Sequence, residues 1–224
     1  METWTLPPHM KSLRGQTVKN FGYDNQNFIN YSFNSQGFRS DEFDLSQRKL
    51  IVFGGSTSFG MGVDQSLTFA TQLASTLDLS LHNLSFGCYL HENHDYLENL
   101  KIMARLDCDD VFLIQINNAD RRRISQDTVI RNNSEDFCVS RVVDFFEQAN
   151  DILKYKTKIF LYWDDKNHNI PKTITKQFLL HNHFHLDHSI PARPGSFGPK
   201  SHNFIFKTIH SRLSSHRVAL RLIS

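Results

Sequence analysis

The feature that most constrains the fold is a short apolar run, Lys49–Phe53, that ends directly in Gly54-Gly55. An uninterrupted apolar run of this length is typical of a strand buried on both faces of a parallel sheet. The two glycines suit a sharp turn after the strand. Over residues 67–77 apolar side chains recur every three or four positions, which predicts a helix with one face against a sheet. This strand, turn and helix place Ser56 on the turn.

The same alternation continues along the chain. Further strands are predicted over residues 79–86, 110–116 and 158–163, and further helices over residues 92–105, 139–154 and 200–213. Alternating strands and helices favour a parallel sheet with helices on both faces, joined by right-handed crossovers. The predicted class is α/β, as a three-layer α/β/α sandwich around a mostly parallel central sheet.

The first 48 residues have a different composition from the rest of the chain. They are rich in Asn, Gln, Ser, Gly and Phe and show neither helical nor strand periodicity over a useful length. We therefore expect an extended N-terminal arm over residues 1–48, an α/β domain over residues 49–215 and a C-terminal tail over residues 216–224. A chain of 224 residues is long enough for one core of this kind.

Charge and cysteine content narrow the class of partner. The formal net charge is +2, and the basic residues at 121–123, 217 and 221 do not form a long stripe. A nucleic-acid partner is therefore not expected. The three cysteines are far apart and include no C-x-x-C pair, which argues against a disulfide scaffold and indicates a reducing compartment.

Signals for export or membrane insertion are not found in the sequence. The first ten residues lack a basic stretch followed by an apolar core, and no apolar run approaches the roughly 20 residues of a membrane-spanning helix. We expect no signal peptide, no transmembrane segment, no membrane partner and a cytoplasmic location.

Three predicted loops follow the carboxyl ends of the first three strands, at residues 54–62, 87–93 and 117–121. Ligands of open parallel sheets bind at this edge. The first loop carries Ser56 on a glycine-rich strand-to-helix turn, which can expose a nucleophile while backbone N–H groups point at its target. The same residues could instead cap the following helix. Both interpretations are open from this segment alone.

Four blocks in order resemble those of SGNH (GDSL-like) hydrolases. A lead-in and first block read YSFNSQGFR at 31–39 and VFGGSTSFGMGV at 52–63, with Gly55 where the family usually has Asp. The others read NLSFGC at 83–88, LIQINN at 113–118, where the family pattern is Gly-x-Asn-Asp, and GPKSH at 198–202. The resemblance covers residues 31 to about 210 and implies the flavodoxin-like fold of that family.

The resemblance also implies roles for residues of the first three loops. Ser56 would be the nucleophile, and its own N–H, the N–H of Cys88 and the side chain of Asn117 would form an oxyanion hole. Cys88 and Gln115 stand where the family favours glycine. For Asn117 the alternative is an asparagine that caps a turn through its own side chain.

The activating base departs from the family pattern. The family places Asp-x-x-His just before the last block, whereas this chain has Arg193 and Ser196 at those positions. A serine needs a base to remove its proton as the new bond forms. Candidates in the same region are the pair Asp187 and His188, and His202. Asp165 and His168 have the family spacing, but in a different loop. For His202 the alternative is a structural histidine on the first turn of the last helix.

The histidines between 181 and 188 form a cluster that could hold a metal ion together with Asp187. Alternating histidines in a loop are more typical of a solvated segment, and we expect neither a metal nor another cofactor.

Two functions are compatible with this sequence. The first is a serine esterase or deacylase that acts on acyl esters of a carbohydrate or lipid, with an acylated small molecule or glycan as its partner. The second is a catalytically inactive module of the same fold, which would join a homo-oligomer or a larger assembly through the N-terminal arm. The last block resembles that of SGNH-like chains of phages and aquatic bacteria, so the assembly in the second case could be a phage particle.

Overall fold

The structure, a computed structural model, describes residues 6, 8–21, 28–44, 46–87, 93–105, 109–116, 121–125, 128–131, 134–162, 171–175, 178–180 and 198–215. A five-stranded sheet forms its centre, and every neighbouring pair of strands in it is parallel. In spatial order the strands are β4 (Ser80–Asn83), β3 (Lys49–Phe53), β5 (Val111–Ile116), β8 (Thr157–Tyr162) and β9 (Phe178–Leu180).

The strand order is that of flavodoxin-like folds. Numbered along the chain, the parallel strands follow the order 2-1-3-4-5, and the chain changes direction across the sheet between β4 and β5. The loop after β3 lies at this switch point. The predicted α/β class with a mostly parallel sheet is therefore confirmed, and β9, which the sequence did not predict, extends the sheet by one strand.

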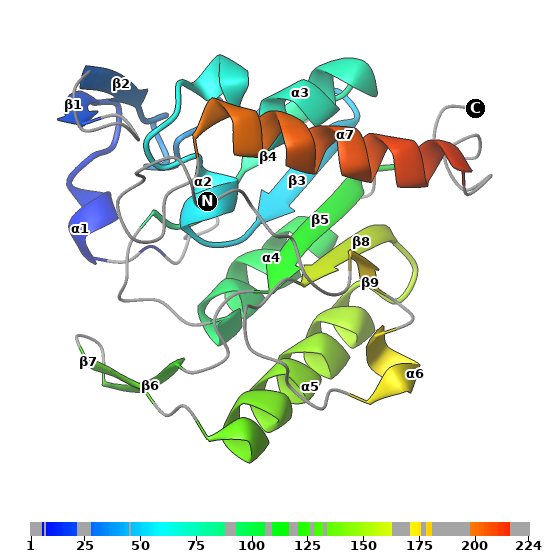
Figure 1. Cartoon of the computed structure of the whole chain (residues 1–224). Coiled ribbons are helices and arrows are strands. Elements are labelled where there is room, and N and C mark those ends of the chain that lie inside the picture. Colours follow the sequence, from blue (N-terminus) through cyan, green and yellow to red (C-terminus); the bar gives the residue numbers. More distant parts are fainter. Residues whose placement is uncertain are drawn as a thin grey trace.

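Four longer helices cover the sheet: α3 (Phe69–Thr76), α4 (Leu97–Ala104), α5 (Glu135–Ile152) and α7 (Pro199–Ser215). Side chains of β3 alternate between two apolar cores. Ile51 and Phe53 join the core under α4 and α5, whereas Leu50 and Val52 join the core under α3 and α7. Figure 1 shows these two helix pairs on opposite sides of the sheet. The predicted three layers are therefore present.

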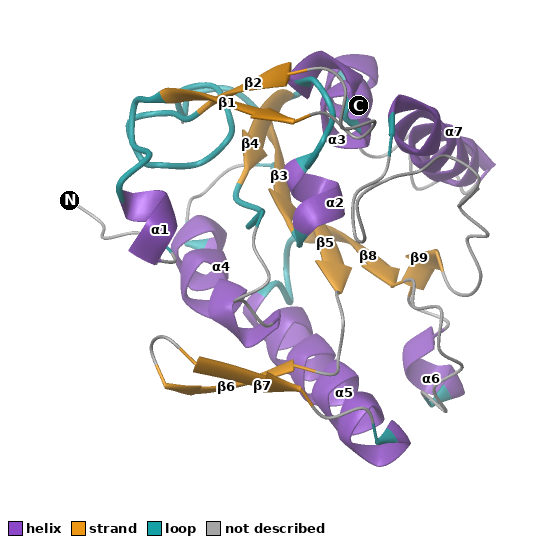
Figure 2. Cartoon of the chain, turned by 60° about the vertical axis from the view of Figure 1, so that its left-hand side comes forward, coloured by secondary structure: helices purple, strands orange, loops and turns teal. Residues whose placement is uncertain are grey.

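The N-terminal segment differs from the expected extended arm. It contains α1 (Pro8–Lys11) and an antiparallel hairpin of β1 (Thr17–Phe21) and β2 (Phe28–Ser32). The hairpin is a separate two-stranded sheet, found at the upper left of Figure 1 and at the top of Figure 2. Alternate residues of β2 are buried, and Ile29 and Tyr31 join the same apolar core as Phe53. Residues before 49 therefore complete the main core, because their aromatic side chains cover part of it.

Several shorter elements complete the described chain: α2 (Ser56–Phe59), the 3-10 helices η1 (Gln65–Leu67) and η2 (Asn93–Tyr96), α6 (Lys172–Thr175), and the hairpin of β6 (Arg121–Ser125) and β7 (Thr128–Arg131). The helix predicted over 67–77 begins at Phe69, after η1, and the helix predicted over 92–105 begins with the 3-10 turn η2. Across the described ranges, no helix combines the length and apolarity needed to cross a membrane.

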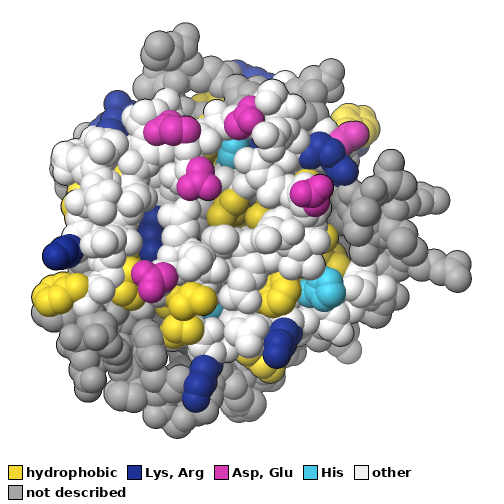
Figure 3. Space-filling view, turned by 90° about the horizontal axis from the view of Figure 1, so that it is seen from above, with side chains coloured by type: hydrophobic (Ala, Val, Ile, Leu, Met, Phe, Trp, Pro, Cys, Tyr) yellow, Lys and Arg dark blue, Asp and Glu magenta, His cyan; other side chains and the backbone are white. Residues whose placement is uncertain are grey.

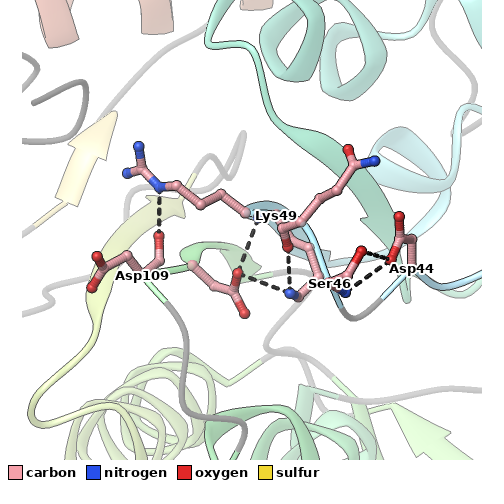
Figure 4. A network of polar contacts seen from close by, with 7 residues as sticks. Asp44, Ser46, Lys49 and Asp109 are labelled. Atoms are coloured by element: carbon pink, nitrogen blue, oxygen red, sulfur yellow. Dashed lines mark hydrogen bonds and ion pairs between the residues drawn. The ribbon is translucent and has the colours of Figure 1, made fainter.

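A buried ion pair joins the amino ends of β3 and β5 (Figure 4). Lys49 Nζ lies 3.3 Å from Asp110 Oδ1, and the two side chains are 0% and 1% exposed. The same carboxylate oxygen accepts the backbone N–H of Lys49 at 3.0 Å, and Nζ also donates to Gln47 O at 2.6 Å. This network lies at the opposite end of β3 from Ser56.

The face seen from above in Figure 3 carries charges of both signs. Most of the Asp and Glu side chains lie in the upper half of this view, whereas Lys and Arg side chains are scattered around it (Figure 3). Leu67 of η1 and Phe204 of α7 are exposed apolar side chains, at 43% and 50%.

Candidate active site

Ser56 is the first residue of α2, directly after the turn that ends β3. Gly55 occupies the N-cap position with extended backbone, so Ser56 does not cap this helix. The Ser56 side chain is half-buried, whereas Thr57, Ser58 and Phe59 of the same helix are buried. Gly55, and not Ser56, is therefore the N-cap residue of this segment, and Ser56 lies on the predicted turn between a strand and a helix.

The turn requires glycine at position 54. A Cβ on Gly54 would lie 2.6 Å from Ser58 Oγ and 2.8 Å from Gln115 Cβ, closer than real side chains approach. Helix α2 can therefore pack directly onto β5 only because residue 54 has no side chain.

A buried polar network fixes the turn from below. Ser58 donates both its N–H, at 3.2 Å, and its hydroxyl to Gln115 Oε1. Asn83 at the end of β4 donates to Ser58 O at 2.8 Å and accepts the N–H of Ser85 at 3.1 Å. The second and third blocks thus hold the serine turn through side chains. Gln115 stands where the family pattern has glycine, and its side chain fills the space beneath the turn. The sequence alone showed the substitution but not this contact.

Tyr96 of η2 contacts the turn from the side. Its hydroxyl donates to Gly54 O, which also accepts the N–H of Phe86 at 2.9 Å. The Tyr96 ring stacks on Phe86 at 4.8 Å and meets Phe53 edge-on at 6.1 Å. Tyr96 lies within the helix predicted over residues 92–105, where an aromatic side chain is expected only to pack in the core.

Tyr96→Phe is expected to lower the free energy of unfolding by about 1 kcal/mol, because Gly54 O keeps one of its two donors. Urea denaturation followed by circular dichroism measures this. Tyr155→Phe is the matched control, since Tyr155 is 88% exposed and surface changes usually stay within about 0.5 kcal/mol. If Tyr96→Phe is as stable as wild type, the hydrogen bond from Tyr96 to Gly54 O does not stabilise the turn, and the prediction is wrong.

His202 lies on the first turn of α7 and is 0% exposed. Its Nδ1 accepts the backbone N–H of Phe69, the first residue of α3, at 3.1 Å, and its ring stacks on that of Phe69 at 5.8 Å. Burial and, to a lesser extent, the positive charge of Arg39 lower its pKa to about 3. With Nδ1 accepting, the neutral ring carries its hydrogen on Nε2 and has no free lone pair. A general base needs such a lone pair, so the contacts favour the structural interpretation.

A second histidine, His94 of η2, forms a pair that the sequence analysis missed. His94 Nε2 lies 2.7 Å from Asp144 Oδ2, and Nδ1 lies 2.6 Å from Arg141 Nη2. A guanidinium only donates, so Nδ1 accepts and Nε2 carries the hydrogen toward Asp144. The carboxylate and the histidine resemble a catalytic dyad in type, but the lone pair of His94 is engaged by Arg141. The cluster joins η2 to α5.

The remaining candidate residues lie outside the described part of the chain. These are Cys88, Asn117, Asp165, His168, Asp187 and His188, together with the other histidines between 181 and 188. Cys88 and Asn117 follow the carboxyl ends of β4 and β5, the two strands that flank β3. Among the described residues, no group of three or more His, Cys, Asp or Glu side chains is arranged to hold a metal ion.

Comparison with known proteins supports the fold. A scan against family models and a search of curated proteins find no match. Among solved structures, the chain is similar to an acetyl xylan esterase from the rumen bacterium Butyrivibrio proteoclasticus, with a TM-score of 0.51 and 17% identity over 78% of this chain and 65% of that chain.

Two further solved structures are similar at lower scores. One is a carbohydrate esterase family 2 enzyme plus carbohydrate binding domain from Corynascus thermopiles, with a TM-score of 0.47 and 10% identity over 77% of this chain and 66% of that chain. The other is a member of the lipolytic protein G-D-S-L family from Veillonella parvula, with a TM-score of 0.48 and 11% identity over 75% of this chain and 97% of that chain.

The chain spans less than two thirds of the length of the Butyrivibrio and Corynascus proteins. At 17% identity the likeness to the Butyrivibrio enzyme concerns the fold alone. The chain has an SGNH hydrolase-like fold, as its four sequence blocks predicted.

Proposed function

We propose that this chain is an SGNH-type serine esterase or deacylase that cleaves acyl esters of a carbohydrate or lipid. The observation that carries the proposal is the position of Ser56. It begins α2 on a tight turn at the carboxyl end of β3, at the point where the strand order reverses. Enzymes with open α/β sheets bind their ligands at this point.

In the proposed reaction Ser56 Oγ attacks the ester carbonyl as a base takes its proton. The carbonyl oxygen gains negative charge facing the N–H of Ser56, with the N–H of Cys88 and the side chain of Asn117 as the further donors. The alcohol then leaves with the proton from the base, and water releases the acyl group from Ser56. Each well-placed donor typically accelerates such a reaction about a hundredfold or more.

For the base we propose His188, held by Asp187. The lone pairs of His202 and His94 are engaged by Phe69 and Arg141, so neither is suited to take the serine proton. An acetyl group on a carbohydrate is the first substrate to try, because the similar Butyrivibrio protein is an acetyl xylan esterase.

Labelling with a fluorophosphonate probe tests the nucleophile. We expect wild type to be labelled on Ser56 and Ser56→Ala to be unlabelled, with kcat/KM for nitrophenyl acetate lowered by on the order of 10⁴-fold. Ser140→Ala, which changes an exposed serine of α5, should be labelled like wild type.

The base is tested in the same assay. His188→Gln should lower the labelling rate at least about a hundredfold, and His202→Asn, which keeps an acceptor for the Phe69 N–H, should lower it far less. Failure of the folded wild-type chain to react with the probe would contradict the esterase proposal and favour the inactive module.

A further inference from the structure

We propose that Arg39, which precedes the central sheet, is a positioning residue for Ser56. The proposal rests on the proposed esterase function and deepens it: the N-terminal segment supplies the part that holds the nucleophile turn in its reactive geometry. Arg39 acts through residues 59–63, which comprise the last residue of α2 and the loop that follows this helix.

The guanidinium of Arg39 donates to three carbonyl groups of this one segment. Nη1 donates to Phe59 O at 3.1 Å and to Gly60 O, and Nη2 donates to Val63 O at 2.6 Å. A planar guanidinium presents its donors in a rigid fork, so it sets the directions of these carbonyl groups relative to one another. A lysine would keep the charge but not this geometry.

Arg39 is almost fully enclosed. It is 1% exposed, and its guanidinium carbon lies 4.1 Å from the centre of the Tyr31 ring and 5.5 Å from that of Phe59. Burial lowers its pKa to about 10, which leaves it charged at neutral pH. Removing a cation from water is costly. The cost is offset here by the carbonyl groups of residues 59, 60 and 63 and by the rings of Tyr31 and Phe59.

The loop needs such support because its backbone is unusual. Gly60 and Gly62 both have left-handed backbone, with φ of 78° and 81°. Glycine adopts many backbone conformations at similar free energy, so these two residues do not fix the shape of the loop by themselves. Tyr31 Oη accepts the N–H of Gly62 at 2.6 Å. Two side chains of the N-terminal segment therefore hold this stretch: Arg39 binds residues 59, 60 and 63, and Tyr31 binds residue 62.

The loop is bonded back to the nucleophile itself. The N–H of Met61, between the two glycines, donates to Ser56 O at 2.9 Å, and the N–H of Phe59 donates to Gly55 O at 2.8 Å. A change in the direction of the Gly60 carbonyl would therefore move Met61 and, through it, Ser56. A misplacement of about 1 Å in a reacting group can cost about a hundredfold in rate.

The kinetic test uses Arg39→Lys, with Tyr31→Phe as a milder change and Arg14→Met as the control on an exposed arginine of the same segment. We expect Arg39→Lys to lower kcat for nitrophenyl acetate by about 10- to 100-fold with KM within about twofold. Tyr31→Phe, which keeps the ring and removes one bond, should lower kcat less, and Arg14→Met should leave it unchanged. Measurements well below each variant's melting temperature remove the effect of unfolding.

Amide hydrogen exchange tests the positioning role without catalysis. In Arg39→Lys, exchange of the amides of residues 56–63 should accelerate at least about tenfold, while that of α5 stays as in wild type. Unchanged exchange in 56–63, or wild-type kcat in the folded variant, would overturn the proposal. If the wild-type chain has no esterase activity, only the proposed esterase function is contradicted. The hydrogen-exchange result would still show whether Arg39 holds the turn that carries Ser56.

Discussion

Asp110→Asn should lower the free energy of unfolding by about 3–5 kcal/mol, although the two side chains have nearly the same shape. The change leaves an acceptor for the Lys49 N–H but removes the negative charge 3.3 Å from Lys49 Nζ. Lys49 is 0% exposed and cannot turn to water. Its ammonium group would then stay buried next to the neutral amide introduced at position 110 and Gln47 O, without a negative charge to balance it.

The cost should largely disappear when the lysine is replaced too. In Asp110→Asn the further change Lys49→Met removes the buried charge and keeps most of the apolar stem, and well-packed apolar replacements of buried ion pairs are often neutral. A double-mutant cycle by urea denaturation therefore measures a coupling between the two sites.

An exposed pair provides the control for this cycle. Lys101 Nζ and Glu98 Oε1 lie 2.7 Å apart on α4, but their side chains are 47% and 65% exposed, so Glu98→Gln should cost at most about 0.5 kcal/mol. A loss of under about 1 kcal/mol in Asp110→Asn would contradict the expected role of the buried pair.

Lowering the pH from about 7 to about 4.5 should reduce the free energy of unfolding by about 3–5 kcal/mol, through two buried histidines. Burial, and then Lys49, lower the pKa of His82 to about 4, against smaller opposing effects of Asp110 and Asp44. His202, described above, has its pKa lowered to about 3. The ordinary value for both is 6.5.

The sign follows from proton binding. Between the lowered values and 6.5, the unfolded chain binds more protons than the folded chain, so stability rises with pH. The contribution of each histidine is complete above about pH 6.5 and is lost as the pH falls toward its folded value. Each unit by which the pKa of a histidine is lowered contributes at most about 1.4 kcal/mol to the pH dependence. Screening by nearby water reduces this contribution, so the expected total loss is about 3–5 kcal/mol.

Single variants assign the effect. His82 is 0% exposed, its ring lies 4.5 Å from that of Phe43, and neither ring nitrogen has a hydrogen-bond partner among the described residues. His82→Leu should therefore fold at pH 7 and should remove about half of the pH dependence. His202→Asn should remove most of the rest. A pH dependence that is unchanged in both variants would show that these histidines do not control acid stability.

The central strands could be predicted because their local sequence is decisive. β3 and β5 are buried on both faces and consist almost wholly of apolar residues, a composition that few other structures tolerate. β1 and β2 were missed because a short hairpin with one exposed face gains its stability from packing, and Ile29 and Tyr31 pack on residues far along the chain. β9 has three residues, too few to show a period.

The site was predictable in part for the same reason. A glycine-rich turn between a strand and a helix is a local pattern, and Ser56 follows from it. Ser58, Asn83 and Gln115 lie within the recognised blocks, yet their hydrogen bonds join three different strand ends, which no local pattern can predict.

The α/β class, the parallel strands and the position of Ser56 at the carboxyl end of β3 follow from local sequence, because periodicity and turn chemistry act over neighbouring residues. The contacts of Arg39 and His202 do not follow from local sequence. Arg39 contacts carbonyl groups 20 to 24 residues away, and His202 accepts a hydrogen bond from a residue 133 positions away. Hydrogen-bond partners and burial depend on which distant segments pack together. Only in the folded chain is Arg39 enclosed against residues 59–63, and only there does His202, a candidate base, accept the N–H of Phe69.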